Sequence, residues 1–184
     1  MQKAAISVLG NDRPGIVAAV SRILFENACN VEDVSQTALQ GEFAAIFIVF
    51  PTRDWRIEEL RRALETGLEP MGLRVLVKMM EAAPEQPAAV PSEPFVVTTT
   101  GPDRLGLVAG ITEVMARFQV NITNLKAAFR GGDDPLANTM IYEVEVPVGI
   151  DQPAFRKALA DRARELGLDL SLQHRDIFEA VHRI

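Results

Sequence analysis

The sequence predicts an α+β protein made of two tandem copies of one small domain, each with the element order β-α-β-β-α-β. The first indication is an internal repeat: GNDRPGIVA at residues 10–18 returns as GPDRLGLVA at residues 101–109, and the alignment runs without a gap as far as Asn30 and Asn121. The second is that both copies alternate short apolar runs with apolar stripes at helical spacing. The third is a stretch rich in Pro, Ala and Glu, residues 81–93, whose composition is typical of an extended linker. A chain of 184 residues fits one domain or two small ones, and the repeat decides for two.

The first strand and helix of the first copy meet at the repeated motif. Residues 4–9 form a short apolar run that stops at Gly10, which indicates a buried strand. Pro14 suits the first turn of the following helix, because the N–H that proline lacks would have no helical partner there. The apolar stripe of that helix is Ile16, Val20, Ile23 and Leu24.

A hairpin and a second helix complete the first copy. Residues 31–39 and 43–50 are β-prone and flank Gly41, which predicts a hairpin with its tip near residues 40–42. A second amphipathic helix follows, and an extended run at 73–80 ends the copy. The residues expected to face inward from that helix are Ile57, Leu60, Leu64 and Leu68.

The second copy repeats this order and then adds a tail. Its expected strands lie at 95–100, 122–129, 140–146 and 168–172, and its helical stripes at 107–118 and 155–166. The hairpin of this copy has a longer, acidic loop at 131–135. Two interlocked β-α-β halves of this kind give a four-stranded antiparallel sheet with both helices on one face, the ferredoxin-like arrangement. The expected division is domain one at 1–80, linker at 81–93, domain two at 94–175 and an amphipathic C-terminal tail at 176–184.

Composition excludes several classes of function. A formal net charge of −6 and a pI of about 5.0 disfavour direct nucleic-acid binding, which needs Lys and Arg to neutralise phosphates. No apolar run approaches the roughly 18 residues of a membrane span, and no signal peptide is visible at the N-terminus. The single cysteine, Cys29, cannot form an intrachain disulfide and fits a reducing compartment. We therefore expect a cytoplasmic protein that contacts neither nucleic acid nor membrane.

Catalytic and metal-binding chemistry find no support in the sequence. His174 and His182 are the only histidines, and no Cys, His or Asp cluster with metal-ligand spacing accompanies them. Cys29 has no His near it in sequence, which favours a buried structural thiol over a nucleophile. The acidic loop at 131–135 lacks the spacing of an EF-hand. We expect a protein that is not an enzyme and has no metal or cofactor.

The repeated motif has the chemistry to hold a small zwitterion. A helix N-terminus offers unpaired N–H groups and a partial positive charge to a carboxylate. Such N–H groups are expected around residues 13–16 and 104–107, where Gly15 and Gly106 would allow a close approach. An ammonium group needs acceptors, which are offered by the side chains of Asn30, Asp12, Asn121 and Asp103.

Each of these residue types also has a purely structural alternative. The two Asp residues could cap their helices, and the two Gly residues could serve only close helix–strand packing. The two Asn residues could be left-handed turn residues between a helix and a strand. Arg13 and Arg104 could pair with a carboxylate ligand, with a nearby acid or with solvent. Recurrence of the whole loop favours a site, because capping alone does not demand the same sequence twice.

A G-x-D-R-x-G-(I/L)-V-A motif that opens a helix, followed by Asn-(Val/Ile) opening a strand, resembles the ACT domain, a regulatory module that usually binds amino acids. The resemblance covers residues 3–80 and 94–175. Two such domains joined by a Pro-rich linker without an enzyme resemble the glycine cleavage system transcriptional repressor family. In ACT proteins the ligand typically sits between two ACT units. The resemblance carries this ligand-binding role onto Asn11, Asp12, Gly15, Asn30 and Val31, and in the second copy onto Pro102, Asp103, Gly106, Asn121 and Ile122.

The resemblance implies a regulator rather than a catalyst. The expected ligand is a small amino acid, glycine or serine, and the expected partner is a protein, in the repressor family a DNA-binding transcriptional activator. Pairing of ACT units implies a pseudo-dimer within the chain or a homodimer. A ligand-free interaction module is the alternative, since Pro102 replaces Asn11 and Leu105 replaces Pro14 in the second copy. An RNA-binding ferredoxin-like domain is less favoured, because it needs basic, aromatic strands for base stacking, which residues 45–47 and 144–146 do not supply.

Overall fold

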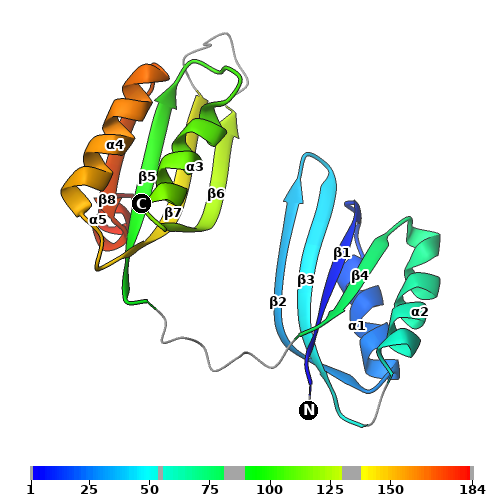
Figure 1. The fold of residues 1–184 in the computed structure, drawn as a ribbon. Coiled ribbons are helices and arrows are strands. Elements are labelled where there is room, and N and C mark those ends of the chain that lie inside the picture. Colours follow the sequence, from blue (N-terminus) through cyan, green and yellow to red (C-terminus); the bar gives the residue numbers. More distant parts are fainter. Residues whose placement is uncertain (1, 54–55, 81–89, 130–137, 183–184) are drawn as a thin grey trace. The chain divides into compact units, whose positions relative to one another are not determined.

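The computed structural model describes residues 2–53, 56–80, 90–129 and 138–182 of the chain. The chain divides into two compact units, residues 1–86 and 87–184. Each unit is an antiparallel sheet with two helices packed on one of its faces (Figure 1). The predicted α+β class, with two tandem ferredoxin-like domains, is confirmed.

The first unit follows the predicted order and adds one short 3-10 turn. Its elements are β1 (Ala4–Asn11), α1 (Ile16–Glu26), β2 (Cys29–Leu39), β3 (Glu42–Pro51), α2 (Ile57–Leu68), η1 (Glu69–Met71) and β4 (Arg74–Met79). The sheet order is β2-β3-β1-β4, so the two strands that flank each helix are never adjacent. At the hairpin tip, Gln40 and Gly41 both have positive φ, 51° and 85°, the conformation of a two-residue turn that suits the twist of paired strands. The tip predicted near Gly41 is therefore confirmed.

Alternation along the strands separates the core of the first unit from its open face. Ile6 and Val8 of β1 and Phe47 of β3 point toward the helices and are buried. Leu60, Leu64 and Leu68 of α2 pack against them, as the helical spacing predicts. On the other face, Ile46 and Leu76 lie on either side of Ser7 and are exposed.

The second unit repeats the arrangement and carries one more helix. Its elements are β5 (Ser92–Gly101), α3 (Leu107–Arg117), β6 (Asn121–Phe129), β7 (Asn138–Pro147), α4 (Gln152–Glu165), β8 (Asp169–His174) and α5 (Arg175–His182). The sheet order is β6-β7-β5-β8. Tyr142, Phe155 and Met115 are among its largest buried side chains. The α4 helix begins with a side-chain cap, because Asp151 accepts a hydrogen bond from the backbone N–H of Ala154 at 2.9 Å.

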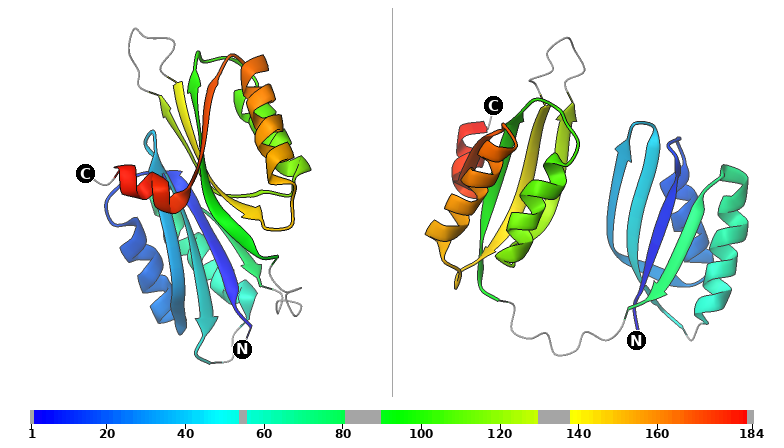
Figure 2. Two further views of the ribbon diagram at one scale, coloured as in Figure 1. Left: turned by 90° about the vertical axis from the view of Figure 1, so that its left-hand side faces the viewer. Right: turned by 45° about the horizontal axis from the view of Figure 1, so that its top comes forward.

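The predicted C-terminal amphipathic segment is the helix α5, which packs against β5 and β8 (Figure 2). It lies on the sheet face opposite α3 and α4. This position accounts for Val96, which points away from the core residue Val97 and is nevertheless buried. Arg175 at the start of α5 donates a hydrogen bond to Glu145 of β7 at 3.1 Å. The two units therefore differ, since the described residues of the first unit include no counterpart of α5.

Two sequence expectations need correction or fall outside the description. Pro14 does not occupy the first turn of a helix, because Gly15 is the N-cap of α1 and the helix begins at Ile16. The predicted loop at 131–135 lies outside the described residues, as does most of the predicted linker at 81–93.

Candidate functional site

The repeated motif forms the turn between the first strand and first helix of each unit. Gly15 is the N-cap of α1 with φ 94° and ψ −3°, and Gly106 is the N-cap of α3 with φ 89° and ψ 3°. Side chains other than glycine rarely adopt this left-handed conformation. No side chain forms a capping hydrogen bond at either helix. The first-turn N–H groups of both helices therefore remain without a side-chain cap, which leaves them available to an anion.

The structural alternatives for the motif residues are largely wrong. Asp12 and Asp103 do not cap the helices, since the cap position lies three residues further on at a glycine. Packing does not explain Gly15 and Gly106 either, because a Cβ added at each would meet nothing within 4 Å. Their backbone conformation is what requires glycine.

The glycine at the strand end has a different role from the one at the cap. A Cβ on Gly101 would lie 2.8 Å from Leu168 Cδ2 and 2.9 Å from the carbonyl oxygen of Gly167. A Cβ on Gly10 would meet Leu73 and the backbone of Gly72 in the same way. Each motif thus holds one glycine for close packing and one for positive φ.

The two asparagines also differ from their structural alternative. Asn30 lies within β2 and Asn121 begins β6, and neither has a positive φ. The left-handed residues are Ala28, φ 53°, and Gln119, φ 56°, each just before the strand.

In the first unit, the motif lines a shallow hollow of about 300 Å³. Asp12, Arg13 and Gly15 come from the turn, and Gln36 and Phe43 come from the hairpin. The Asp12 backbone N–H donates to the Gly41 carbonyl oxygen at 2.7 Å, which ties the turn to the hairpin tip. The β3 side of this hollow is apolar, because the residue that lines it there is Phe43.

In the second unit, the equivalent hollow is larger, about 530 Å³. Asp103, Arg104 and Gly106 line it from the turn, and Asn138 lines it from β7. Asn138 is 5% exposed, and its Nδ2 donates a hydrogen bond to Asp103 Oδ1 at 3.3 Å. Asn138 was not among the residues predicted for the site; the one available signal is that it is a polar residue at the start of a strand in which every second position after it is apolar.

The two arginines of the motif are used differently. Arg104 donates a hydrogen bond to the carbonyl oxygen of Leu166, at the turn that leads from α4 to β8. Its guanidinium also stands where a Cβ on Gly167 would be. Arg13 has no hydrogen bond or ion pair with any described residue. Arg104 therefore stabilises the turn between α4 and β8 of its own unit, whereas Arg13 is available to a ligand or partner.

Asn30 and Asn121 lie at the far end of the sheet from the motif turns. Gly10 is opposite Phe43 on β3 whereas Asn30 is opposite Phe50, so the two levels are separated by about 23 Å of strand. Asn121 is likewise opposite Glu145 on β7, far from Asn138. Within one unit, these amides and the motif turn do not reach one small ligand.

The remaining residues predicted for the site differ in their exposure and in their position in the fold. Asn11 is the exposed last residue of β1, and Pro102 is half-buried directly after β5. Val31 is half-buried and packs against the core of the first unit. Asn121 and Ile122 line a separate open hollow beside the C-terminal half of α3.

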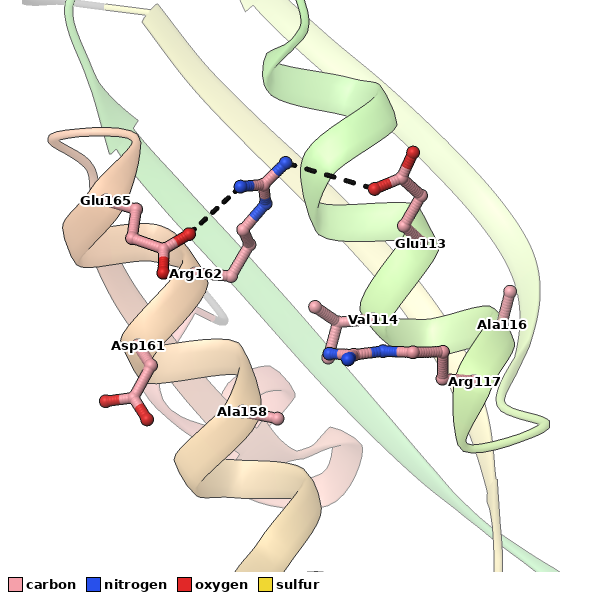
Figure 3. A pocket seen from close by; sticks show the side chains of 8 residues that line it. All are labelled: Glu113, Val114, Ala116, Arg117, Ala158, Asp161, Arg162 and Glu165. Atoms are coloured by element: carbon pink, nitrogen blue, oxygen red, sulfur yellow. Dashed lines mark hydrogen bonds and ion pairs between the residues drawn. The ribbon is translucent and has the colours of Figure 1, made fainter.

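A larger groove of about 660 Å³, lined mostly by charged residues, lies between α3 and α4 (Figure 3). Arg162 of α4 lies between the helices, with ion pairs to Glu165 at 2.9 Å and to Glu113 of α3 at 3.9 Å. Asp161 is paired with Lys157 and Arg164, and these contacts hold the pKa of its carboxyl below the ordinary value. Most of these charged side chains form ion pairs with one another on a solvent-facing surface, as expected for an exposed helix face.

The described residues hold no candidate metal centre. Within residues 2–53, 56–80, 90–129 and 138–182, no three His, Cys, Asp or Glu side chains lie close enough to hold a metal ion. Cys29 is buried, and burial raises the pKa of its thiol, an effect that the charge of Arg53 only partly offsets. No helix in the described ranges has the length and apolar character needed to cross a membrane.

Comparison with known protein families decides the assignment. The family model of the ACT domain matches residues 2–78 and again residues 93–173. The chain belongs to the ACT domain family. Among sequence relatives, a UPF0237 protein of Methanosarcina acetivorans is 38% identical over 94 residues, which are 50% of this chain and 98% of the relative. A UPF0237 protein, YjhC, of Lactococcus lactis is 34% identical over 89 residues, 48% of this chain and 97% of the relative. Each of these relatives is thus about as long as one copy of the repeat.

Solved structures with both copies share the fold. A protein of unknown function from Galdieria sulphuraria aligns with a TM-score of 0.75 and 27% identity, covering 94% of this chain and 98% of its own. A predicted glycine cleavage system transcriptional repressor aligns with a TM-score of 0.64 and 21% identity, covering 94% and 96%. At that identity the second likeness establishes the fold. The resemblance to the ACT domain deduced from the sequence is confirmed.

Proposed function

We propose that this chain is a non-enzymatic regulatory protein that binds a small amino acid, with glycine and serine as the first candidates, at its motif turns. The observation that supports this most is the pairing of opposite chemistries at one place. A helix N-terminus without a side-chain cap presents N–H groups, and Asp12 or Asp103 presents a carboxylate beside it. A zwitterionic amino acid needs both. Membership of the ACT family and recurrence of the turn in both units support the same ligand class.

Binding would act by shifting an equilibrium between states of the protein. A ligand changes such an equilibrium only by the difference between its affinities for the two states. The partner that we propose is a DNA-binding regulator of amino-acid or one-carbon metabolism, a direction taken from the repressor whose fold this chain shares. A net charge of −6 favours contact with a basic protein surface over contact with DNA itself.

The ligand proposal is tested with the full chain and the twenty standard amino acids. We expect glycine or serine to raise the melting temperature and to give a saturable heat of binding in calorimetry. Asp12→Ala and Asp103→Ala test the two turns separately, because neither side chain caps a helix. An unchanged melting temperature with all twenty amino acids at millimolar concentration would contradict the proposal.

One observation favours a second role, association through the open face of the first sheet. Ile46 and Leu76 share that face and are 51% and 67% exposed. Leu9 on the same strand surface is 52% exposed. Several exposed apolar side chains on one sheet face are typical of interfaces. If a homodimer uses this face, Ile46→Lys will lower the mass measured by sedimentation without changing the circular dichroism spectrum, and an unchanged mass would exclude this interface.

A further inference from the structure

We infer that the amino-acid site of this chain belongs to the second unit and that Asn138 is the residue that recognises the ammonium group of the ligand. This inference rests on the proposed function and narrows it to one turn, one acceptor and one class of ligand. The ligand class is a small amino acid with a free α-ammonium and a free α-carboxylate.

The side-chain carbonyl of Asn138 is a buried acceptor without a donor. Asn138 is 5% exposed, and its Oδ1 has no hydrogen-bond partner. The orientation of the amide is fixed by Asp103, because a carboxylate can only accept and must therefore face the Nδ2 group, at 3.3 Å. A buried carbonyl oxygen without a hydrogen-bond partner is energetically disfavoured. A ligand N–H that donates to it would supply the missing hydrogen bond.

The opposite chemistry lies on the same hollow. Gly106, Leu107 and Val108 line it at the N-terminus of α3, where no side chain caps the helix. Their N–H groups and the helix dipole suit a carboxylate. Asn138 Oδ1 and the Asp103 carboxylate suit an ammonium. One hollow thus presents donors and acceptors together, as the α-carbon substituents of an amino acid require.

Strand register identifies the residues that replace these in the first unit. Gly101 lies opposite Asn138 in the second sheet, and Gly10 lies opposite Phe43 in the first, so Phe43 takes the place of Asn138. In the neighbouring strand, Ala127 lies opposite Met140. The same comparison puts Gln36, opposite Ala45, in the place of Ala127.

The replacement of Asn138 by Phe43 removes the buried acceptor, and the hollow of the first unit is smaller. Phe43 is buried and offers no hydrogen-bonding atom where Asn138 offers a carbonyl. The hollow shrinks from about 530 Å³ in the second unit to about 300 Å³ in the first. The first unit keeps the turn, the Asp12 carboxylate and the Gln36 side chain, but its described residues have no counterpart of the buried, unpartnered Asn138 carbonyl. Because that acceptor is missing and the hollow is smaller, we expect one site per chain.

Calorimetric titration of the full chain with glycine, and with L-serine as a second probe, tests this inference. We expect one site per chain, and we expect Asn138→Leu to weaken binding roughly tenfold to a hundredfold, the loss that follows from removing one charge-assisted hydrogen bond. The matched variant Phe43→Leu changes the equivalent position of the first unit and should leave the affinity unchanged. N-acetylglycine keeps the carboxylate but has no ammonium, and it should not bind the wild-type protein.

The outcomes separate this inference from the function on which it rests. Two equal sites per chain, wild-type affinity in a folded Asn138→Leu variant, or equal binding of N-acetylglycine would each overturn the inference while leaving amino-acid binding in place. Binding of neither glycine nor serine to the wild-type protein would overturn both. If Asn138→Leu does not fold, the stoichiometry and the N-acetylglycine comparison still decide, because both use the wild-type chain.

Discussion

The two glycines of the second motif give the sharpest test of how the turn is built. Gly101→Ala adds a Cβ at 2.8 Å from Leu168 Cδ2 and at 2.9 Å from a backbone oxygen, so something must move. Overpacking of this kind costs about 1–3 kcal/mol, with backbone contacts toward the upper end. Gly106→Ala adds a Cβ that touches nothing but must hold φ near 89°. That conformation costs a residue with a Cβ about 1–2 kcal/mol, partly offset by about 0.4–1 kcal/mol from the reduced entropy of the unfolded chain.

The expected order of stability in the second unit is therefore wild type, then Gly106→Ala at about 1 kcal/mol lower, then Gly101→Ala at about 2–3 kcal/mol lower. Hydrogen exchange of the full chain, followed by mass spectrometry, measures this because peptides from each unit report separately. Exchange should accelerate in peptides of residues 92–129 and stay unchanged in peptides of residues 4–51. The reasoning is refuted if Gly106→Ala destabilises the second unit more than Gly101→Ala, since strain at the cap would then exceed the clash at the strand end.

Three further predictions concern charge and titration. Arg104→Ala should destabilise the second unit by about 0.5–1 kcal/mol, because it removes the hydrogen bond to the Leu166 carbonyl. Arg13→Ala should not destabilise the first unit. Equal changes in the urea midpoint, each measured against wild type, would contradict this. Cys29 should react slowly with a disulfide reagent in native protein and fast in urea, because its thiol is buried and the pKa raised; rapid native labelling would show the burial to be wrong. Burial also raises the pKa of Tyr142, so both groups hold their protons in the folded state to higher pH than in the unfolded state. The stability that these two protonated groups contribute is complete below their ordinary pKa values and is lost as pH rises through the raised pKa values. Chemical denaturation at increasing alkaline pH should therefore show falling stability, and a rise would refute this reasoning.

Most of the fold could be predicted because its signals are local. The alternation at Ile6 and Val8, the helical spacing of Leu60, Leu64 and Leu68, and the glycine at the hairpin tip each depend on a few neighbouring residues. The duplication supplied the domain count.

Only part of the proposed site is visible in the sequence, because the rest depends on residues that the fold brings together. Asp103 and Gly106 belong to a continuous motif that the sequence shows directly. Asn138 lies in another strand and reaches Asp103 only through the β5–β7 register. Its place in the repeat is also shifted, since the first-unit equivalent of Asn138 is Phe43, outside the ungapped alignment of the motif. The use of Arg104 depends on the turn at Leu166, which the motif does not encode.

The starts of α1 and α3 were also hard to predict from the sequence. An aspartate close to the start of a helix usually indicates a cap, and Asp12 and Asp103 were open to that interpretation. Both helices start four residues later, after a left-handed N-cap glycine, so neither carboxylate caps its helix. The distinction depends on φ at Gly15 and Gly106, a quantity that residue type suggests but does not fix.

The most direct test of amino-acid binding is an NMR titration of 15N-labelled protein with glycine. The account predicts saturable shifts of the backbone amides of Gly106, Leu107 and Val108 and of the side-chain amide of Asn138, while the amides of Gly15 and Ile16 stay in place. Saturable shifts confined to Gly15 and Ile16 would move the site to the first unit. The absence of any saturable shift at either turn up to millimolar glycine, and then serine, would contradict the claim that this chain senses a small amino acid.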